Sequence, residues 1–105
     1  MLSRVNRLPK EEMPRVFRGG FHVRGDAIEL VYRKTKEPSR FAFIVSSKTE
    51  KRAAARNRMR RLMSESVRHV VNMSQPLDGI FIAKKNFADM RQPEVEKIVR
   101  GLLRL

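Results

Sequence analysis

The sequence predicts an α+β fold, a single-domain sandwich with elements in the order α-β-β-β-α-β-α around a four-stranded sheet. Its 105 residues allow one compact domain with a small core. Several short segments are apolar or alternate between apolar and polar residues, as strands do. One long segment has apolar residues three and four positions apart, as helices do. No internal repeat or interdomain linker interrupts the chain.

The N-terminal part is expected to hold one short helix and one short strand. Residues 1–12 are polar and are expected to be extended or loose. Pro14 suits the first turn of a helix from about Met13 to Arg18, and the two glycines that follow favour its end. A short strand is expected within residues 21–25.

Two stronger strands follow. From Ala27 to Lys34 apolar and polar residues alternate, which predicts a half-buried strand. Residues 35–39 are expected to form a hairpin-type connection. From Phe41 to Ser46 the chain is apolar at successive positions, which predicts a central strand covered by helices on both faces.

The second half is expected to contain a long helix, a strand and a terminal helix. The long helix spans about Lys51 to Val71, because three successive alanines favour a helix and apolar residues then recur on one face. A strand at Ile80–Ala83 and a helix from about Gln92 to Leu103 complete the fold. The strands on either side of the long helix are expected to be parallel, as in a β-α-β unit. The apolar face of the long helix comprises Ala55, Met59, Leu62, Met63, Ser66 and Val70.

Charge indicates the kind of partner. The chain has 24 lysines and arginines against 11 acidic residues, a formal net charge of +13. Such an excess attracts anions and suits a nucleic acid or an anionic membrane. The long helix carries arginines beside its apolar face, and guanidinium groups bind phosphates through two hydrogen bonds. The partner is therefore expected to be a polyanion.

Missing features exclude several classes of protein. The chain has no cysteine, which excludes disulfides, thiolate catalysis and cysteine-bound zinc. His22 and His69 lack metal-ligand spacing, and Asp26, Asp78 and Asp89 are scattered, unlike the ligands of a two-metal nuclease. No nucleophile motif or glycine-rich phosphate loop is present, so no catalytic residue is assigned. The lack of a long apolar segment and of a secretion signal predicts a soluble, cytoplasmic protein.

One motif in its setting resembles a known family. The segment Arg56–Leu62 opens with an Arg-Asn-Arg tripeptide and follows a Phe-rich strand in a small basic chain. The tripeptide alone is weak evidence, but at this place it is specific. Over nearly its whole length the chain resembles the protein component of bacterial ribonuclease P. The other matching segments are Arg7-Leu8, Val16-Phe17-Arg18, Gly20, Arg40–Ser46 and Gly79–Ala83.

The resemblance implies a function and a fold detail that the residues alone do not give. In this family a separate RNA subunit is the catalyst, uses Mg²⁺, and removes the 5′ leader from precursor tRNA. The protein binds that RNA and holds the leader. The implied partners are ribonuclease P RNA and precursor tRNA, with no DNA, no membrane and no metal site on the protein. The implied fold is ribosomal protein S5 domain 2-like, with a left-handed β-α-β crossover where the general rule gives a right-handed one.

The resemblance also assigns RNA contacts. The tripeptide is the first candidate for binding the RNA backbone, and the basic residues around it extend the surface. The alternative interpretation is a solvated helix face and a charged loop. The candidate RNA-binding residues are Arg56, Asn57, Arg58, Arg60, Arg61, Lys48, Lys51, Arg52 and Arg68.

In the family, the leader lies in a cleft between the first helix and the sheet. Phe17, Leu30 and Tyr32 are the candidates here, because unpaired bases stack on aromatic rings. The alternative for these residues is packing in the core. Phe41, Phe43 and Phe81 are expected in the core.

Three positions depart from the family pattern. Ser47 stands where a lysine is common, Ser64 where an arginine is common, and Met13 where a phenylalanine is usual. Each departure weakens one expected contact, and none affects the central tripeptide.

Other functions remain as alternatives. A structural RNA-binding protein of the ribosomal type has similar size and charge, and composition does not separate the two. A DNA-binding protein is disfavoured because the basic helix lacks a helix-turn-helix partner. A membrane-surface helix is disfavoured because the strands need its apolar face for a core.

Overall fold

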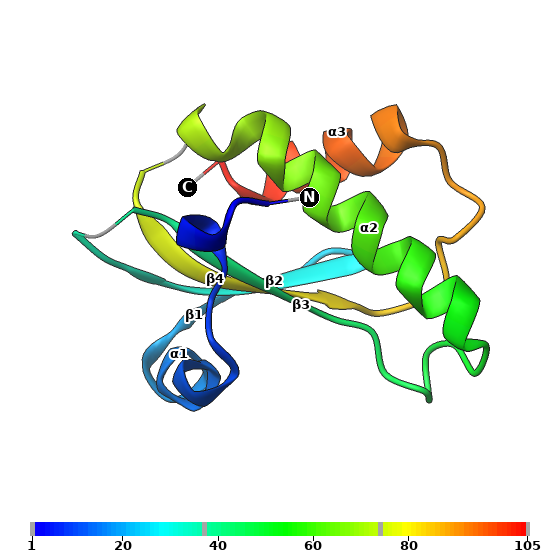
Figure 1. Ribbon diagram of the computed structural model, residues 1–105, viewed down its shortest axis with the longest axis horizontal. Helices are drawn as coiled ribbons and strands as arrows, with labels where there is room; N and C mark the ends of the chain where they lie inside the picture. The colour runs from blue at the N-terminus through cyan, green and yellow to red at the C-terminus, as the bar shows by residue number, and fades with distance from the viewer. Residues whose placement is uncertain (1, 37, 74, 105) are drawn as a thin grey trace.

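The computed structural model describes residues 2–36, 38–73 and 75–104. A four-stranded sheet carries α2 (Ala53–Val70) and α3 (Gln92–Leu102) on one face and the short α1 (Met13–Gly19) on the other (Figure 1). The elements follow the expected order of the fold class. The strands are β1 (Phe21–Val23), β2 (Ile28–Lys34), β3 (Arg40–Ile44) and β4 (Leu77–Ala83). Short 3-10 turns lie at Arg4–Asn6, Lys10–Glu12 and Val71–Met73.

The last strand in sequence lies inside the sheet. The spatial order is β1-β2-β4-β3, with β2 antiparallel to both of its neighbours. β3 and β4 are parallel and connected through α2, which confirms the expected β-α-β unit. Gly79 suits the crowded middle of the sheet, because a Cβ there would lie 3.1 Å from side-chain atoms of Leu30, Leu77 and Phe41.

The position of β4 corrects two expectations. Residues 35–39 do not form a hairpin connection, because β4 separates β2 from β3. β3 is an edge strand rather than a central one, and neither of its faces is fully covered, since Phe43 on the core face is also only partly buried. Phe41 faces the core and is 2% exposed, whereas Ala42 and Ile44 on the other face are only partly buried. Apolar residues on both faces of β3 therefore mark an open apolar surface.

β2 and the N-terminal segment are more buried than expected. Leu30 joins the core cluster formed with α2 and α3, while Val31 packs on the opposite face under α1, so both faces of β2 are covered. The segment before α1 is not loose, since Leu2 and Leu8 are buried. The backbone N–H of Leu8 donates to the carbonyl oxygen of Phe41 at 2.9 Å, which fixes this segment along the edge of β3.

α2 covers the sheet through the apolar face that the spacing predicts. Met59, Met63 and Val67 are fully buried in the core. Ser66 lies in the same face, and its hydroxyl donates to the carbonyl oxygen of Leu62 at 2.7 Å, so no polar group there is left unpaired. Because this face is fixed on the sheet, the arginines of α2 are left at its sides and on its outer surface.

An ion-pair network fixes α1 against the other face of the sheet. Arg40 at the start of β3 donates to both carboxylate oxygens of Asp78, at 3.1 and 2.9 Å, and to both of Glu12, at 2.7 and 2.9 Å. Arg15 of α1 donates to the same two carboxylates, at 3.2 and 2.9 Å. Asp78 is 3% exposed and is the register partner of Arg40. The planar guanidinium fork therefore joins α1 to β3 and β4.

The network shifts the pKa values of Glu12 and Arg40. Hydrogen bonds from Arg40, together with its charge, hold the pKa of Glu12 below its ordinary value of 4.5. Hydrogen bonds to Glu12 and Asp78 raise the pKa of Arg40, so the guanidinium stays charged.

The Glu12–Arg40 pair predicts an acid-dependent contribution to stability. A carboxyl group whose pKa is lower in the folded state stabilises the fold above its unfolded-state pKa and loses that contribution as the pH falls. We expect Glu12→Gln to lower the melting temperature at neutral pH, and we expect its difference from the unmodified protein to shrink between about pH 5 and pH 3. Circular dichroism melts measure this. Glu11→Gln is the control, and a pH-independent effect of Glu12→Gln would contradict the assignment.

Candidate nucleic-acid interface

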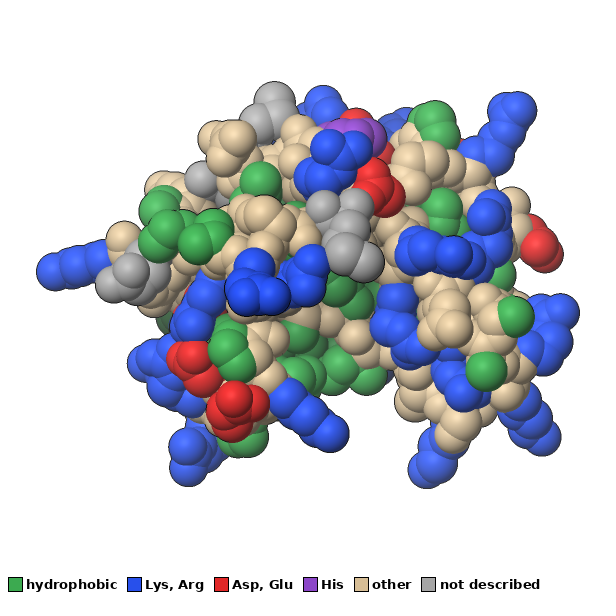
Figure 2. Space-filling model, viewed as in Figure 1, with side chains coloured by type: hydrophobic (Ala, Val, Ile, Leu, Met, Phe, Trp, Pro, Cys, Tyr) green, Lys and Arg blue, Asp and Glu red, His purple; other side chains and the backbone are tan. Residues whose placement is uncertain are grey.

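Cationic side chains gather around the start of α2. Figure 2 shows Lys and Arg over the N-terminal half of α2 and the loop before it, at the right of the view. The N-cap residue, Arg52, makes no side-chain capping bond, and the first turn contains no acidic residue. The first N–H groups of a helix carry partial positive charge. Basic side chains near this N-terminus are therefore electrostatically unfavourable, whereas an anion such as phosphate stabilises it.

The Arg-Asn-Arg tripeptide sends its two arginines to different sides of α2, because residues two apart do not share a helix face. Arg56 Nη1 donates to the carbonyl oxygens of Glu50 at 3.0 Å and Lys51 at 2.8 Å. Arg58 Nε donates to the carbonyl oxygen of Ala88 at 2.5 Å. Arg56 thus binds α2 to the loop before it, and Arg58 binds α2 to the loop before α3. Since a guanidinium has five N–H donors, each arginine retains donors for a phosphate.

Glu50 organises the loop before α2. Its carboxylate accepts hydrogen bonds from Arg52 Nε at 3.1 Å, Arg52 Nη2 at 3.2 Å and Asn86 Nδ2 at 2.6 Å. It also accepts the backbone N–H of Arg52 at 2.7 Å, and the side-chain and backbone bonds from Arg52 lower the pKa of Glu50. Arg52 is therefore paired within the protein, although its side chain is largely exposed.

The other basic candidates differ in how free they are to bind. Within the described residues, the side chains of Lys48, Lys51 and Arg61 are exposed and form no hydrogen bond or ion pair. Arg60 donates to the side-chain oxygen of Asn57. Lys48, Lys51 and Arg61 are therefore the cations most available to an RNA backbone.

Arg68 lies further along α2 and is already neutralised. Its Nη2 and Nε donate to Glu65 Oε2 at 2.9 and 3.1 Å. The neighbouring His69 Nδ1 is 2.7 Å from Glu96 Oε1 of α3, so this end of α2 is used for contact between the helices. Arg68 is consequently a weaker candidate than its spacing in the sequence indicates.

The structure separates the three leader-cleft candidates. Leu30 is fully buried and Tyr32 packs against the same core cluster, so both face α2 and α3 rather than α1. Tyr32 pairs there with Phe21, with ring centroids 5.6 Å apart. Phe17 lies on α1, on the opposite face, and is 40% exposed. Strand alternation decides this, because every second residue of β2 points away from α1. A cleft between α1 and the sheet can therefore include Phe17 but neither of the β2 candidates.

Other residues line the open face beside α1. Met13, Ala42, Ile44 and Ile82 are partly buried apolar residues that pack around the small cluster under α1. Figure 2 shows a hollow with hydrophobic side chains between α1 at the lower left and the loop before α2 at the lower right. Sequence reasoning missed this surface. The sequence feature that indicates this surface is the second apolar face of the strand from Phe41 to Ser46. The same feature also fits a strand covered by helices on both faces, which is the prediction made from the sequence.

The part of the chain that the structure describes contains neither a metal-ligand cluster nor a membrane-spanning helix. No three His, Asp or Glu residues there gather as ligands for a metal ion. No helix there is long and apolar enough to cross a membrane.

Comparison with known proteins gives the family. The family model for Ribonuclease P matches residues 2–105. This chain belongs to the ribonuclease P protein family. The ribonuclease P protein component of Dehalococcoides mccartyi strain CBDB1 is 38% identical over 104 residues, covering 97% of this chain and 85% of the relative. The component from Fusobacterium nucleatum is 35% identical over 100 residues, covering 89% of each chain. The family supplies a subunit of the enzyme that processes the 5′ end of tRNA.

Solved structures share the fold. The RNase P protein from Thermotoga maritima superposes with a TM-score of 0.82 at 21% identity, covering 93% of this chain and 94% of that one. The RNase P protein of Staphylococcus aureus gives a TM-score of 0.82 at 20% identity, covering 96% and 94%. The α+β architecture of the family is therefore the architecture of this chain.

Arg61 of α2, whose guanidinium has no partner among the described residues, gives a direct test of the candidate interface. Arg61→Ala should weaken binding to a bacterial ribonuclease P RNA. It should also reduce the magnitude of the slope of log affinity against log salt concentration by about 1, because binding with one phosphate contact fewer releases fewer counterions from the RNA. The melting temperature should not change, since Arg61 has no partner within the described residues. Arg24→Ala, at an exposed arginine between β1 and β2, is the control. Equal salt slopes for both variants would remove Arg61 from the interface.

Proposed function

We propose that this chain is the RNA-binding and substrate-positioning subunit of ribonuclease P. It binds the catalytic RNA through the basic surface at the start of α2. It holds the unpaired 5′ leader of precursor tRNA on the open apolar face beside α1. The observation that carries the proposal is the hollow between α1 and the basic loop before α2, since it puts an apolar surface next to cations.

A single strand of nucleic acid needs both features. Its bases lose contact with water when they rest on apolar or aromatic side chains, and its phosphates need cations close by. Phe17 on α1 offers a partly exposed ring, and Ala42, Ile44 and Ile82 offer partly buried apolar side chains on the same side of the sheet. Lys48 and Lys51 lie in the loop that borders the hollow and carry unpaired ammonium groups among the described residues. The leader's backbone can therefore run from α1 towards the start of α2.

The chemistry of cleavage belongs to the RNA in this proposal. Mg²⁺ held by the RNA subunit supplies the metal-ion chemistry of phosphodiester hydrolysis. The described residues of this chain offer no cluster of carboxylates that fits such an ion. The contribution of the protein is to bind, to orient the leader and to add positive charge near the phosphates. That charge reduces the amount of free Mg²⁺ needed to hold RNA and substrate together.

The decisive experiment is cleavage of a precursor tRNA by a bacterial ribonuclease P RNA at low Mg²⁺, with and without this protein. We expect the protein to restore removal of the leader and to cleave nothing by itself. Failure to restore cleavage with several bacterial RNA types, with the protein shown to be folded, would favour a structural RNA-binding protein.

The placement of Phe17 predicts a leader-specific defect. Phe17→Ala should weaken binding of precursor tRNA to the RNA–protein complex at least about fivefold, because one base-stacking contact is worth about 1–3 kcal/mol. Binding of mature tRNA, which lacks the leader, should not change. Phe21→Ala is a matched control, since Phe21 is also an exposed aromatic residue but faces the opposite side of the sheet. Equal losses for precursor and mature tRNA would remove Phe17 from the leader contact.

A further inference from the structure

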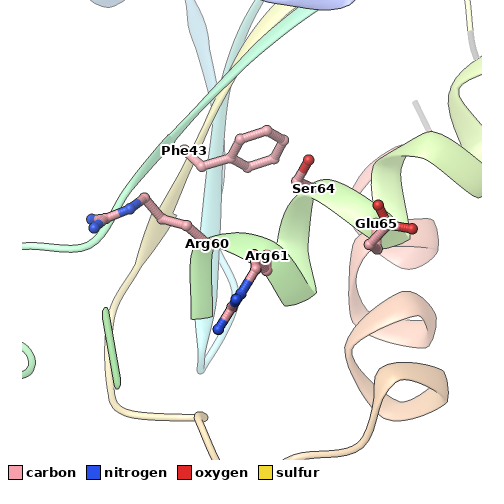
Figure 3. A pocket seen from close by; sticks show the side chains of 5 residues that line it. All are labelled: Phe43, Arg60, Arg61, Ser64 and Glu65. Atoms are coloured by element: carbon pink, nitrogen blue, oxygen red, sulfur yellow. The ribbon is translucent and has the colours of Figure 1, made fainter. Parts of the chain in front are cut away.

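A second apolar pocket lies on the other side of the sheet from the hollow beside α1. It has a volume of about 290 Å³ and lies between the edge strand β3 and the outer side of α2. Its lining residues are Phe43, Arg60, Arg61, Ser64 and Glu65 (Figure 3). Phe43 belongs to the face of β3 that packs toward α2, whereas Ala42 and Ile44 belong to the face toward α1. The pocket is thus separate from the proposed leader surface.

The floor of the pocket is a ring held in a fixed orientation. Phe43 stacks on Phe81, with ring centroids 5.8 Å apart and an angle of 13° between the planes. Phe81 is fully buried in the centre of the sheet, while Phe43 is only partly buried at its edge. A ring supported from behind and reachable from outside is the form of a stacking platform for another flat ring.

The rim of the pocket supplies polar groups. Arg61 has an unpaired guanidinium and Arg60 has one bound only to Asn57, as far as the described residues show. Figure 3 shows the Ser64 hydroxyl directed toward Phe43, and this hydroxyl has no hydrogen-bond partner among the described residues. The Glu65 carboxylate points away in the same view and binds Arg68. The rim therefore offers cations and one hydroxyl rather than a free carboxylate.

We propose that this pocket binds one unstacked nucleobase of the RNA subunit. The base stacks against Phe43, its phosphate pairs with Arg60 or Arg61, and the short side chain of Ser64 leaves room for the ring. A cavity of about 150 Å³ is enough to take up benzene, so a volume of about 290 Å³ accepts a heteroaromatic base. The positive rim favours a nucleotide over an uncharged aromatic ligand. The inference rests on the proposed function, because it takes the RNA subunit as the partner.

Ser64 keeps the pocket open. It stands where the family resemblance leads one to expect an arginine, and a long side chain at this position would extend over Phe43 into the space. The short serine removes one phosphate contact from the basic face of α2. The pocket replaces that contact with a base contact.

Two variants at position 64 distinguish the effect of filling the pocket from the effect of changing a residue of α2. Ser64→Met fills the space with an uncharged side chain, and Ser64→Ala leaves it open. Both residues favour helix more than serine does, so α2 should stay intact in both variants. We expect Ser64→Met to weaken binding to a bacterial ribonuclease P RNA about 5- to 100-fold, because the base loses its stacking contact with Phe43. Ser64→Ala should bind within about twofold of the unmodified protein.

The outcomes separate the two proposals. If the unmodified protein binds the RNA and both variants bind equally well, the base pocket is wrong and the proposed function stands. If the unmodified protein does not bind ribonuclease P RNA at all, both proposals fail. If Ser64→Met does not fold, Phe43→Leu replaces it, since leucine keeps an apolar contact with Phe81 but offers no ring.

A chemical readout locates the base directly. Ultraviolet cross-linking of the complex, followed by mass spectrometry, should give a nucleotide adduct on the peptide that contains Phe43. The adduct should be absent from the Ser64→Met complex. Adducts on other peptides with none at Phe43 would overturn the proposal.

Discussion

The parallel pairing of β3 with β4 is the constraint on which the rest of the structure depends. Two parallel neighbours need a long connection across one face of the sheet, and α2 is that connection. The pairing puts β4 between β2 and β3 and leaves β3 at the edge. It also fixes which side of α2 is buried. The basic surface and both proposed binding surfaces follow from where α2 and β3 come to lie.

The acidic residues around these surfaces are largely used inside the protein. Glu12 and Asp78 hold α1 to the sheet through Arg40, and Glu50 orders the loop before α2. Glu65 neutralises Arg68 near the C-terminal end of α2. Because the chain has 24 basic residues and only 11 acidic ones, internal pairing leaves cations over, and several of them lie around the start of α2. The proposed binding surface consists of cations that the carboxylates of the protein leave unpaired.

β3 serves two surfaces because its residues alternate between the faces of the sheet. Ala42 and Ile44 face the hollow beside α1, and Phe43 between them faces the pocket beside α2. An edge strand makes this possible, since no further strand among the described residues pairs with its outer side, where only the segment at Arg7 and Leu8 contacts Phe41. In the proposed function, the leader and a base of the RNA subunit would contact the same strand from opposite faces. The strand would then link the position of the substrate to the position of the catalytic RNA.

The sequence by itself determined the elements and their chemical character. The periodicity of α2, its apolar face and its arginines follow from local spacing. The parallel direction of the strands on either side follows from the helix between them, because a β-α-β connection brings the chain back in the same direction. The Arg-Asn-Arg tripeptide in its setting was enough to indicate the family, which the family model and the relatives then confirmed. Local pattern is informative here because helix and strand periodicities depend on near neighbours.

Only the tertiary structure decided which residues share a surface. The alternation in β2 indicated two faces, but the position of α1 decided that Leu30 and Tyr32 face away from it. The apolar character of β3 was plain, but the insertion of β4 made it an edge strand and left Ala42 and Ile44 partly open. Arg56 and Arg58 could be counted in the sequence, yet their bonds to loop carbonyls depend on how those loops pack. Strand order and loop contacts depend on residues that are far apart in the chain. The local pattern of apolar and polar residues does not predict such contacts.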